Sequence, residues 1–428
     1  MPTLKFNPET IAIVIFSAVF LWFSASNIID NKIIHQYPIG YFASDGFQNY
    51  GITEGLKEQG NYLYQPYAVA GGFKDVVGTH YPILYHLAVI LSNSISIPTY
   101  DGLILMVILM LLSISYTAYL IIRKFNEKIA ILSLPIMILV TYGKFSYIIT
   151  FGQHGTISGS LYMIGLLWAI STFGLKESTF IILFLSSAML GHAQGFFFGG
   201  MFLGIYLLIN LLSKKLKLSD IKQLFIIGIG TFVITFYYYI ILKNSWIAQG
   251  FSKLDFSTPE KFMQGGAFPL VLLKDFNILI LIALVIGIIV AITLYLKNKT
   301  TSLLVFLFLF ALGFTNYIGF THRAFQQRFL WPIYVSAFIG ISLYYGSKII
   351  MKNVKMIYSL ILFVLLISVL VLAYKDKTKP GSMMDPYHWE SFLWIQKNIQ
   401  KQSTVFFFYQ DITTQHSLYY ASSQRKSY

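Results

Sequence analysis

Long apolar stretches recur along the whole chain, and they constrain the fold more than any other feature of the sequence. A run of about 18 or more such residues can cross the roughly 30 Å hydrocarbon core of a bilayer as a helix. Of all residues, 56% are hydrophobic and only 11% are charged, whereas soluble proteins are about 25% charged. The sequence therefore predicts an all-α polytopic membrane protein, because a membrane barrel would show alternating segments of about ten residues instead.

The loops between these stretches predict how the chain crosses the membrane. Eleven segments qualify as transmembrane helices: roughly 11–29, 102–122, 129–149, 159–175, 178–192, 197–212, 224–242, 276–296, 301–319, 329–346 and 356–374. Four short loops are rich in basic residues: 123–128, 213–222, 297–300 and 347–355. Basic loops favour the cytoplasmic side, and all four share it if the N-terminus is cytoplasmic. We therefore expect an integral protein of the plasma or cytoplasmic membrane with an extracytoplasmic C-terminus.

This topology divides the chain into a membrane module, 1–374, and a short outer tail, 375–428. The first outer loop, 30–101, is large and contains an apolar run at 83–97 that is short for a span. Counting this run as a crossing would move the later basic loops outside. It is therefore predicted to be an interfacial helix, with Pro82 suited to its first turn.

The outer tail has the signals of one helix and one strand. Asp385 is a good N-cap, and Pro386 suits the first helical position. The apolar sequence STVFFFYQ at 403–410 then predicts a strand. A helix and a strand do not make a domain by themselves. The short α/β tail is thus expected either to pack on the membrane module or to begin a soluble domain that is cut short.

Charged residues are almost absent from the predicted spans, and Lys144, near an outer end, is the exception. A charge in the middle of a bilayer costs about 2.5–3.5 kcal/mol on insertion scales, and such charges mark ion or proton pathways. Their scarcity disfavours a proton-coupled transporter and indicates chemistry at the outer face. The net charge of +14 lies in the loops and does not indicate nucleic-acid binding. The chain has no cysteine, which excludes disulfides and thiolate metal sites.

Asp45 follows the first apolar run, in the sequence SDGFQ. One interpretation is structural: with Gln48 three residues later, Asp45 forms a capping box that opens a helix over 46–58. The other interpretation is chemical: a carboxylate at the outer face accepts a proton from a hydroxyl group as a general base, or holds a metal ion. The residues alone leave both interpretations open.

Two short outer turns each place a histidine and a glutamine among glycines. The first contains Gln153 and His154, and the second contains His192 and Gln194. Glycines allow the backbone to approach a ligand closely, so these side chains are candidates for substrate binding. The alternative is that the glycines serve only tight turns between helices. No HExxH or comparable spacing supports a metal site.

Two further segments supply polar side chains at the same face. His80 and Tyr81 precede a proline, which favours an extended conformation for Tyr81 and a defined direction for His80. The second segment brings His322, Arg323 and Arg328 to the outer end of a span. Guanidinium groups suit phosphate because of their planar fork of donors. An arginine at this position can also serve only as an anchor to lipid headgroups.

These pieces, in this order, resemble the GT-C superfamily of integral-membrane glycosyltransferases, with a layout like that of protein O-mannosyltransferases and aminoarabinose transferases. The first outer loop, ASDGFQNYGITEGLKEQGNYLYQPY, is similar to the catalytic loop of the family. THYPILYHLAVIL is similar to its proline-bearing segment, although Tyr81 stands where a first proline is common. RFLWPIYVSAFIGISLYY resembles its penultimate span, and WESFLWIQKNIQKQSTVFFFY resembles the helix and strand that open its soluble portion.

The resemblance implies a glycosyltransferase, inverting and independent of metal, that uses a polyprenyl- or dolichyl-phosphate sugar at the outer face. Asp45 would be the general base, and Arg328 with Arg323 would bind the donor phosphate. Other polar side chains would bind substrate: His80, Tyr81, Lys144, Gln153, His154, His192, Gln194 and His322. The partners would be the lipid-linked donor, membrane lipids and a protein, lipid or glycan acceptor. No cofactor is expected, and a divalent metal is less favoured because Gly46 and Phe47 follow Asp45 where relatives often pair acidic residues.

Two hypotheses from other classes remain at this stage. A transporter or flippase of lipid-linked sugars would need polar groups that continue through the spans, whereas here they stop at the outer rim. A catalytically inactive membrane scaffold would need none of these side chains to react. Replacement of Asp45 by asparagine separates an enzyme from a scaffold.

Overall fold

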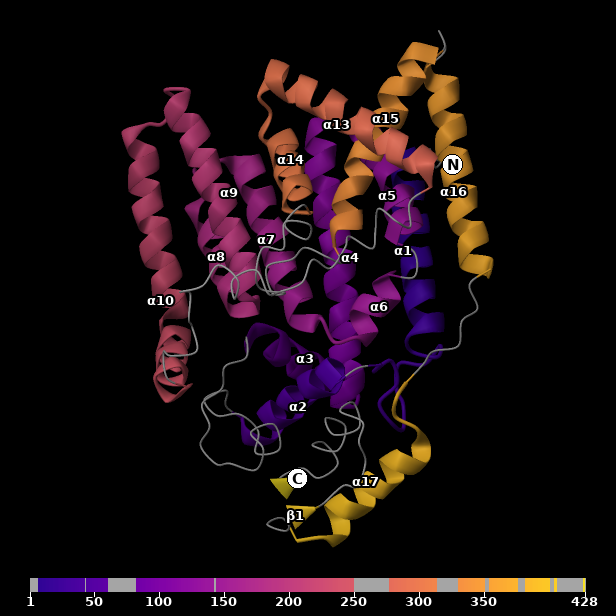
Figure 1. The fold of residues 1–428 in the computed structure, drawn as a ribbon, viewed down its shortest axis with the longest axis vertical. Coiled ribbons are helices and arrows are strands. Elements are labelled where there is room, and N and C mark those ends of the chain that lie inside the picture. Colours follow the sequence, from indigo (N-terminus) through magenta and orange to yellow (C-terminus); the bar gives the residue numbers. More distant parts are fainter. Residues whose placement is uncertain are drawn as a thin grey trace, which may run out of the picture.

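Helices make up almost all of the described structure and stand side by side as a bundle (Figure 1). The computed structural model describes residues 7–42, 44–60, 82–141, 144–249, 277–313, 330–350, 354–375, 382–400, 404–405 and 426–427. The elements are α1 (Pro8–Asn27), α2 (Ser44–Gln59), α3 (Pro82–Ile95), α4 (Thr99–Phe125), α5 (Glu127–Thr141), α6 (Lys144–Thr150), α7 (His154–Phe173), α8 (Ser178–Gly191), α9 (Ala193–Leu212), α10 (Leu218–Gln249), α13 (Ile278–Asn298), α14 (Thr301–Gly313), α15 (Trp331–Ile350), α16 (Val354–Lys375), α17 (Pro386–Asn398), β1 (Thr404–Val405) and β2 (Lys426–Ser427).

Seven of the described helices are long and apolar enough to cross a membrane, namely α1, α4, α7, α9, α10, α13 and α16. The chain is therefore an integral membrane protein. The predicted count of eleven spans is not confirmed. The other four predicted spans fall on α8, which has 14 residues, on α14, of which 13 residues are described, on α15, and on α5 together with α6.

Close contact between helix backbones holds the bundle together. Lipid tails are as apolar as leucine, so helices in a membrane associate through packing, often at small residues. A Cβ atom added to Gly287 of α13 would lie 1.9 Å from the carbonyl oxygen of Phe338 in α15. A Cβ atom on Gly340, on α15, would lie 2.7 Å from the hydroxyl oxygen of Ser133 in α5. These two glycines let α13 and α5 pack closely on α15.

Different elements lie at the two ends of the bundle. At one end lie α2, α3, α17 and the strand pair, in the lower part of Figure 1. At the other end, Arg123 of α4 donates to Glu9 of α1 at 2.6 Å, and Tyr358 of α16 donates to the carbonyl oxygen of Lys128 at 3.3 Å. These contacts gather the basic 123–128 loop and the start of α16 opposite α2. Which end faces the cytoplasm stays a prediction.

The predicted interfacial helix is α3, which begins at Pro82 and packs on α2 and α4. The tail helix is α17, and Asp385 caps it by accepting a hydrogen bond from the backbone N–H of His388 at 2.9 Å. Beyond α17, the structure describes only β1 and β2, which pair in parallel. An α/β tail as a folded unit therefore stays a prediction.

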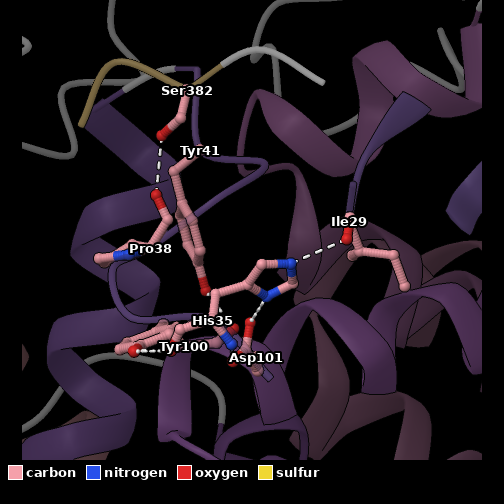
Figure 2. A network of polar contacts seen from close by, with 7 residues as sticks. All are labelled: Ile29, His35, Pro38, Tyr41, Tyr100, Asp101 and Ser382. Atoms are coloured by element: carbon pink, nitrogen blue, oxygen red, sulfur yellow. Dashed lines mark hydrogen bonds and ion pairs between the residues drawn. The ribbon is translucent and has the colours of Figure 1, made fainter. Parts of the chain in front are cut away.

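A buried acid and a buried histidine join the loop that follows α1 to the start of α4 (Figure 2). The carboxylate of Asp101 accepts from the backbone N–H of His35 at 2.8 Å and contacts His35 Nδ1 at 2.6 Å. The other ring nitrogen of His35 lies 2.8 Å from the carbonyl oxygen of Ile29. Tyr100 donates to the carbonyl oxygen of His35 at 2.6 Å. Together these bonds satisfy the polar atoms of a loop that the bundle has buried, as such atoms require.

The tail extends this network. Ser382 donates to the carbonyl oxygen of Pro38 at 2.8 Å, and the N–H of Met383 donates to the carbonyl oxygen of Tyr41 at 2.9 Å. Tyr41 donates in turn to the carbonyl oxygen of Tyr100 at 2.7 Å (Figure 2). The ring of Trp389 on α17 lies edge-on to Tyr100 at 5.8 Å. The tail and the loop after α1, more than 300 positions apart in sequence, are thus held together against the N-terminus of α4.

We expect Asp101→Asn to lower the stability of the protein by roughly 2–4 kcal/mol, because it removes a buried charge partner. The asparagine amide has only one oxygen, which can replace one of the two carboxylate oxygens as an acceptor. Its NH₂ group would then face a nitrogen of His35 that donates to the carboxylate in the wild type. Thermal unfolding in detergent measures the change. Glu177→Gln, at an exposed acid between α7 and α8, is the control, and an equal midpoint for both variants would contradict the role of Asp101.

The pair also predicts a pH dependence of stability. Burial by itself lowers the pKa of His35, but the hydrogen bond and the charge of Asp101 outweigh it, so the pKa is raised above 6.5. A raised folded-state pKa gives a contribution that is complete below about pH 6.5 and is lost as pH rises through the folded value. The gap between the unfolding midpoints of wild type and Asp101→Asn should therefore be larger at pH 6 than at pH 8.5. A gap that widens with pH would refute this assignment.

Candidate functional site at the α2 and α7 helix starts

The structure describes the side chains of five of the predicted site residues: Asp45, Gln153, His154, His192 and Gln194. Five others lie outside the described residues, namely His80, Tyr81, His322, Arg323 and Arg328. Lys144 is the first residue of α6, and its side chain also lies outside the description. The phosphate clamp of Arg323 and Arg328 thus stays a prediction.

Asp45 lies in the first turn of α2, and its side chain is exposed. The predicted helix over 46–58 is present, but it begins at Ser44. Asp45 is therefore a helical residue and not the N-cap, so the capping box with Gln48 is wrong. The chemical interpretation needs a carboxylate that an acceptor can reach, and the exposure of Asp45 meets that requirement.

The first turn of α2 rests on the turn between α6 and α7. Gly152 in this turn has a φ of +81°, and a Cβ atom there would lie 2.1 Å from the nitrogen of Gly46 and 2.4 Å from the carbonyl carbon of Asp45. The N–H of Phe42 donates to the carbonyl oxygen of Thr150 at 2.8 Å. Only glycine suits this position, because it tolerates a positive φ and leaves room for the neighbouring backbone.

Gln153 and His154 come directly after Gly152 and open α7. Gln153 is half-buried, whereas His154 is fully buried. His154 Nε2 lies 2.7 Å from the carbonyl oxygen of Ile149 and so carries the proton. Nδ1 is then an acceptor, and among the described residues it has no hydrogen-bond partner. The same turn therefore positions the start of α2 and the first polar side chains of α7.

The corner between α8 and α9 brings the second histidine and glutamine to α7. His192 is the N-cap of α9, and its side chain accepts from the N–H of Gln194 at 3.2 Å. A Cβ atom on Gly159 would lie 2.5 Å from the Cβ of His192, and one on Gly155 would lie 3.3 Å from its ring. The predicted glycine-lined turns thus do serve tight helix packing, and this packing places His192 one turn along α7 from His154.

The histidine and glutamine side chains of this site carry no charge at neutral pH. Burial lowers the pKa of His192 to about 4, so the ring is uncharged at neutral pH and can accept the hydrogen bond of Gln194. Gln194 is buried, and its side-chain nitrogen has no partner among the described residues, like the hydroxyl of Ser158 on α7. Such groups suit hydroxyl groups or water. In the described part of the chain, no cluster of three histidine or acidic side chains could hold a metal ion.

Two features of this end of the molecule were not predicted from the sequence. The His35–Asp101 pair gave no signal, because the two residues are 66 positions apart. Asn49, which contacts Gly152, could have been found from its spacing, since residues four apart lie on the same face of a helix and Asn49 follows Asp45 by four. Nothing in the chain order indicated that this face meets the α6–α7 turn.

This arrangement has the fold of the GT-C membrane glycosyltransferases, as the predicted resemblance implies. The oligosaccharyltransferase AglB from Archaeoglobus fulgidus, in complex with an inhibitory peptide and a dolichol-phosphate, superposes with a TM-score of 0.63 over 97% of this chain, at 11% identity. ArnT from Cupriavidus metallidurans bound to undecaprenyl phosphate superposes with a TM-score of 0.56 over 97% of this chain and 85% of its own, at 12% identity.

The chain spans 64% of the length of AglB. Neither a scan against protein-family models nor a search of curated protein sequences finds a match. At these identities, the likeness establishes the fold and leaves the chemistry to the residues of this chain.

Gly152→Ala tests the contact on which the site depends. Gly60 at the end of α2 also has a positive φ, +69°, but a Cβ atom there would meet nothing within 4 Å. Gly60→Ala therefore carries only the conformational cost, about 1–2 kcal/mol. Gly152→Ala should cost about 1–3 kcal/mol more because of the clash, measured as the difference between the two thermal midpoints. Equal midpoints would show that the backbones do not touch at Gly152.

Proposed function

We propose that this protein is an inverting glycosyltransferase that transfers a sugar from a polyprenyl- or dolichyl-phosphate donor to an acceptor on the extracytoplasmic face of the membrane. One observation carries the proposal: the chain has the GT-C fold over 97% of its length, and within it the exposed acid Asp45 lies in the first turn of α2, whose backbone rests on the turn that leads into Gln153 and His154. The reaction needs both an accessible base and groups that hold a sugar.

The proposed donor class follows from the compounds bound to the similar structures. AglB was solved with a dolichol-phosphate and ArnT with undecaprenyl phosphate, and both compounds are long isoprenoid phosphates. The apolar bundle of this chain offers a lipid-like environment for such a tail. We propose the same chemical class of donor for this protein and leave the sugar and the acceptor open, since a protein, a lipid or a glycan could each supply a hydroxyl group.

In the proposed reaction, Asp45 accepts the proton of the acceptor hydroxyl as its oxygen attacks the anomeric carbon of the sugar. The bond between this carbon and the phosphate oxygen breaks, and the polyprenyl phosphate leaves with the electron pair. A single displacement inverts the anomeric configuration. A base for the nucleophile and a cation for the leaving oxygen each lower the barrier, and Arg328 with Arg323 is proposed as the cation.

The neutral side chains of the site are proposed to bind the sugar. Gln153, His154, His192 and Gln194 offer donors and acceptors without charge, which suits hydroxyl groups. Further contacts are proposed for side chains that the structure does not describe: His80, Tyr81, Lys144 and His322. The reaction is proposed to need no metal, because glutamine and histidine, and no second acid, stand at the start of α7.

Asp45→Asn should reduce sugar transfer by about 10²- to 10⁴-fold, the range that general-base catalysis contributes, with an unchanged thermal midpoint. Purified protein is assayed with a panel of radiolabelled polyprenyl-phosphate sugars and detergent-solubilised membrane acceptors. Asp30→Asn is the matched control, because Asp30 is an exposed acid of the same loop and asparagine tolerates its positive φ of 47°.

Transfer that is equally fast in Asp45→Asn and wild type would eliminate Asp45 as the base. Movement of a lipid-linked sugar across proteoliposomes without transfer would instead support the flippase hypothesis. Protein that does neither with any donor would support the scaffold hypothesis.

A further inference from the structure

One asparagine links three segments at the site. Asn49 lies on α2 one turn after Asp45, and its Nδ2 donates to the carbonyl oxygen of Gly152 at 2.8 Å. Its Oδ1 accepts from the hydroxyl of Tyr85, on α3, at 2.7 Å. A backbone carbonyl only accepts and a tyrosine hydroxyl can donate, so the two partners define the orientation of the amide.

The location of this amide gives it a specific effect. Gly152 is also the residue at which an added Cβ atom would overlap the backbone of Asp45 and Gly46. The segment between α6 and α7 thus contacts α2 at two places. Gly152 lies against the backbone of Asp45 and Gly46, and its carbonyl oxygen accepts from Asn49, one helical turn further along α2. These two contacts, one turn apart, act together with the packing of α2 on α3 and α4 to fix the rotation of α2 about its axis. That rotation sets the direction of the Asp45 side chain.

Tyr85 ties this loop to the rigid part of the bundle. Tyr85 is buried on α3, and α3 packs closely on α4, because a Cβ atom on Gly102 would lie 2.9 Å from the Cβ of Ser92. Helix α4 is buried over most of its length. The path from α4 through Tyr85 and Asn49 to Gly152 thus connects a stable helix to a short helix that has exposed ends.

We propose that Asn49, held by Tyr85, is a positioning residue that orients Asp45 for proton transfer. The inference rests on the proposed role of Asp45 as the base. Asn49 itself makes its hydrogen bonds to protein groups, so it acts through α2. Catalytic groups must be held close to their reactive geometry, and a displacement of about 1 Å can cost about 10²-fold in rate.

Asn49→Ala should lower kcat of sugar transfer by about 10- to 100-fold, with the KM for the lipid-linked donor within about twofold of wild type. Asn49→Asp should not restore the rate, because a carboxylate can accept from Tyr85 but cannot donate to Gly152. Tyr85→Phe should have a smaller effect, and none when combined with Asn49→Ala, since coupled residues are not additive.

Thr53→Val is the matched control. Thr53 is on the same helix and its hydroxyl donates to the carbonyl oxygen of Asn49 at 2.7 Å, so the variant removes a hydrogen bond from α2 but none to the α6–α7 turn. It should keep the wild-type kcat. An equal loss of kcat in Thr53→Val and Asn49→Ala would overturn the proposal, because it would indicate a general effect on α2.

Hydrogen–deuterium exchange provides a readout that does not depend on activity. Peptides that cover α2 should exchange faster in Asn49→Ala than in Thr53→Val, while peptides from α4 stay unchanged. A loss of kcat without faster exchange of α2 would overturn the positioning role. If wild type shows no transfer but α2 still exchanges faster in Asn49→Ala, the proposed function fails, whereas the role of the Asn49 hydrogen bonds in holding α2 is supported. If exchange and kcat in Asn49→Ala both stay at the wild-type level, the proposed role of Asn49 in holding α2 is refuted.

Discussion

The close approach of two backbones at Gly152 is the constraint on which the site depends. It lets the first turn of α2 lie against the turn before α7, so that Asp45 and the pair Gln153 and His154 are neighbours in space. A side chain larger than hydrogen at Gly152 would separate them. The same device recurs along α7, where Gly159 accepts the α8–α9 corner and thereby places His192. Close backbone contacts at glycines thus determine where the helices meet, and the helices in turn position the polar side chains of the site.

The molecule separates its stabilising interactions by region. Inside the bundle, helices pack through apolar side chains and small residues, because the membrane offers no hydrophobic gain for their association. At the end with α2, α3 and α17, hydrogen bonds and one buried ion pair hold the loop, the tail and α4 together. Buried polar atoms are costly when unpaired, so the His35–Asp101 pair and its backbone partners make this end well defined and give a firm base to the short helices that carry the site.

In the proposed site, an exposed acid and a set of uncharged groups have different roles. The acid can meet an acceptor that arrives from outside, whereas neutral amide and imidazole groups can hold hydroxyls without attracting ions. The charge that the leaving phosphate needs would come from the segment around Arg328, far along the chain. AglB and ArnT share the fold at 11–12% identity, which shows that the helix arrangement tolerates very different side chains.

Much of this protein follows from its sequence alone. The apolar runs determined that it is a helical membrane protein, because nothing else buries such stretches, and Pro82 and Asp385 marked the starts of α3 and α17 by local rules of helix capping. The order of Asp45, the outer turns and the arginine segment indicated the GT-C fold. Local patterns fail, however, where a choice depends on distant partners. They could not decide between a capping role and a chemical role for Asp45, and they could not reveal that Asn49 meets Gly152 or that Asp101 meets His35. Those contacts join segments tens to hundreds of residues apart, so only the tertiary structure decided them.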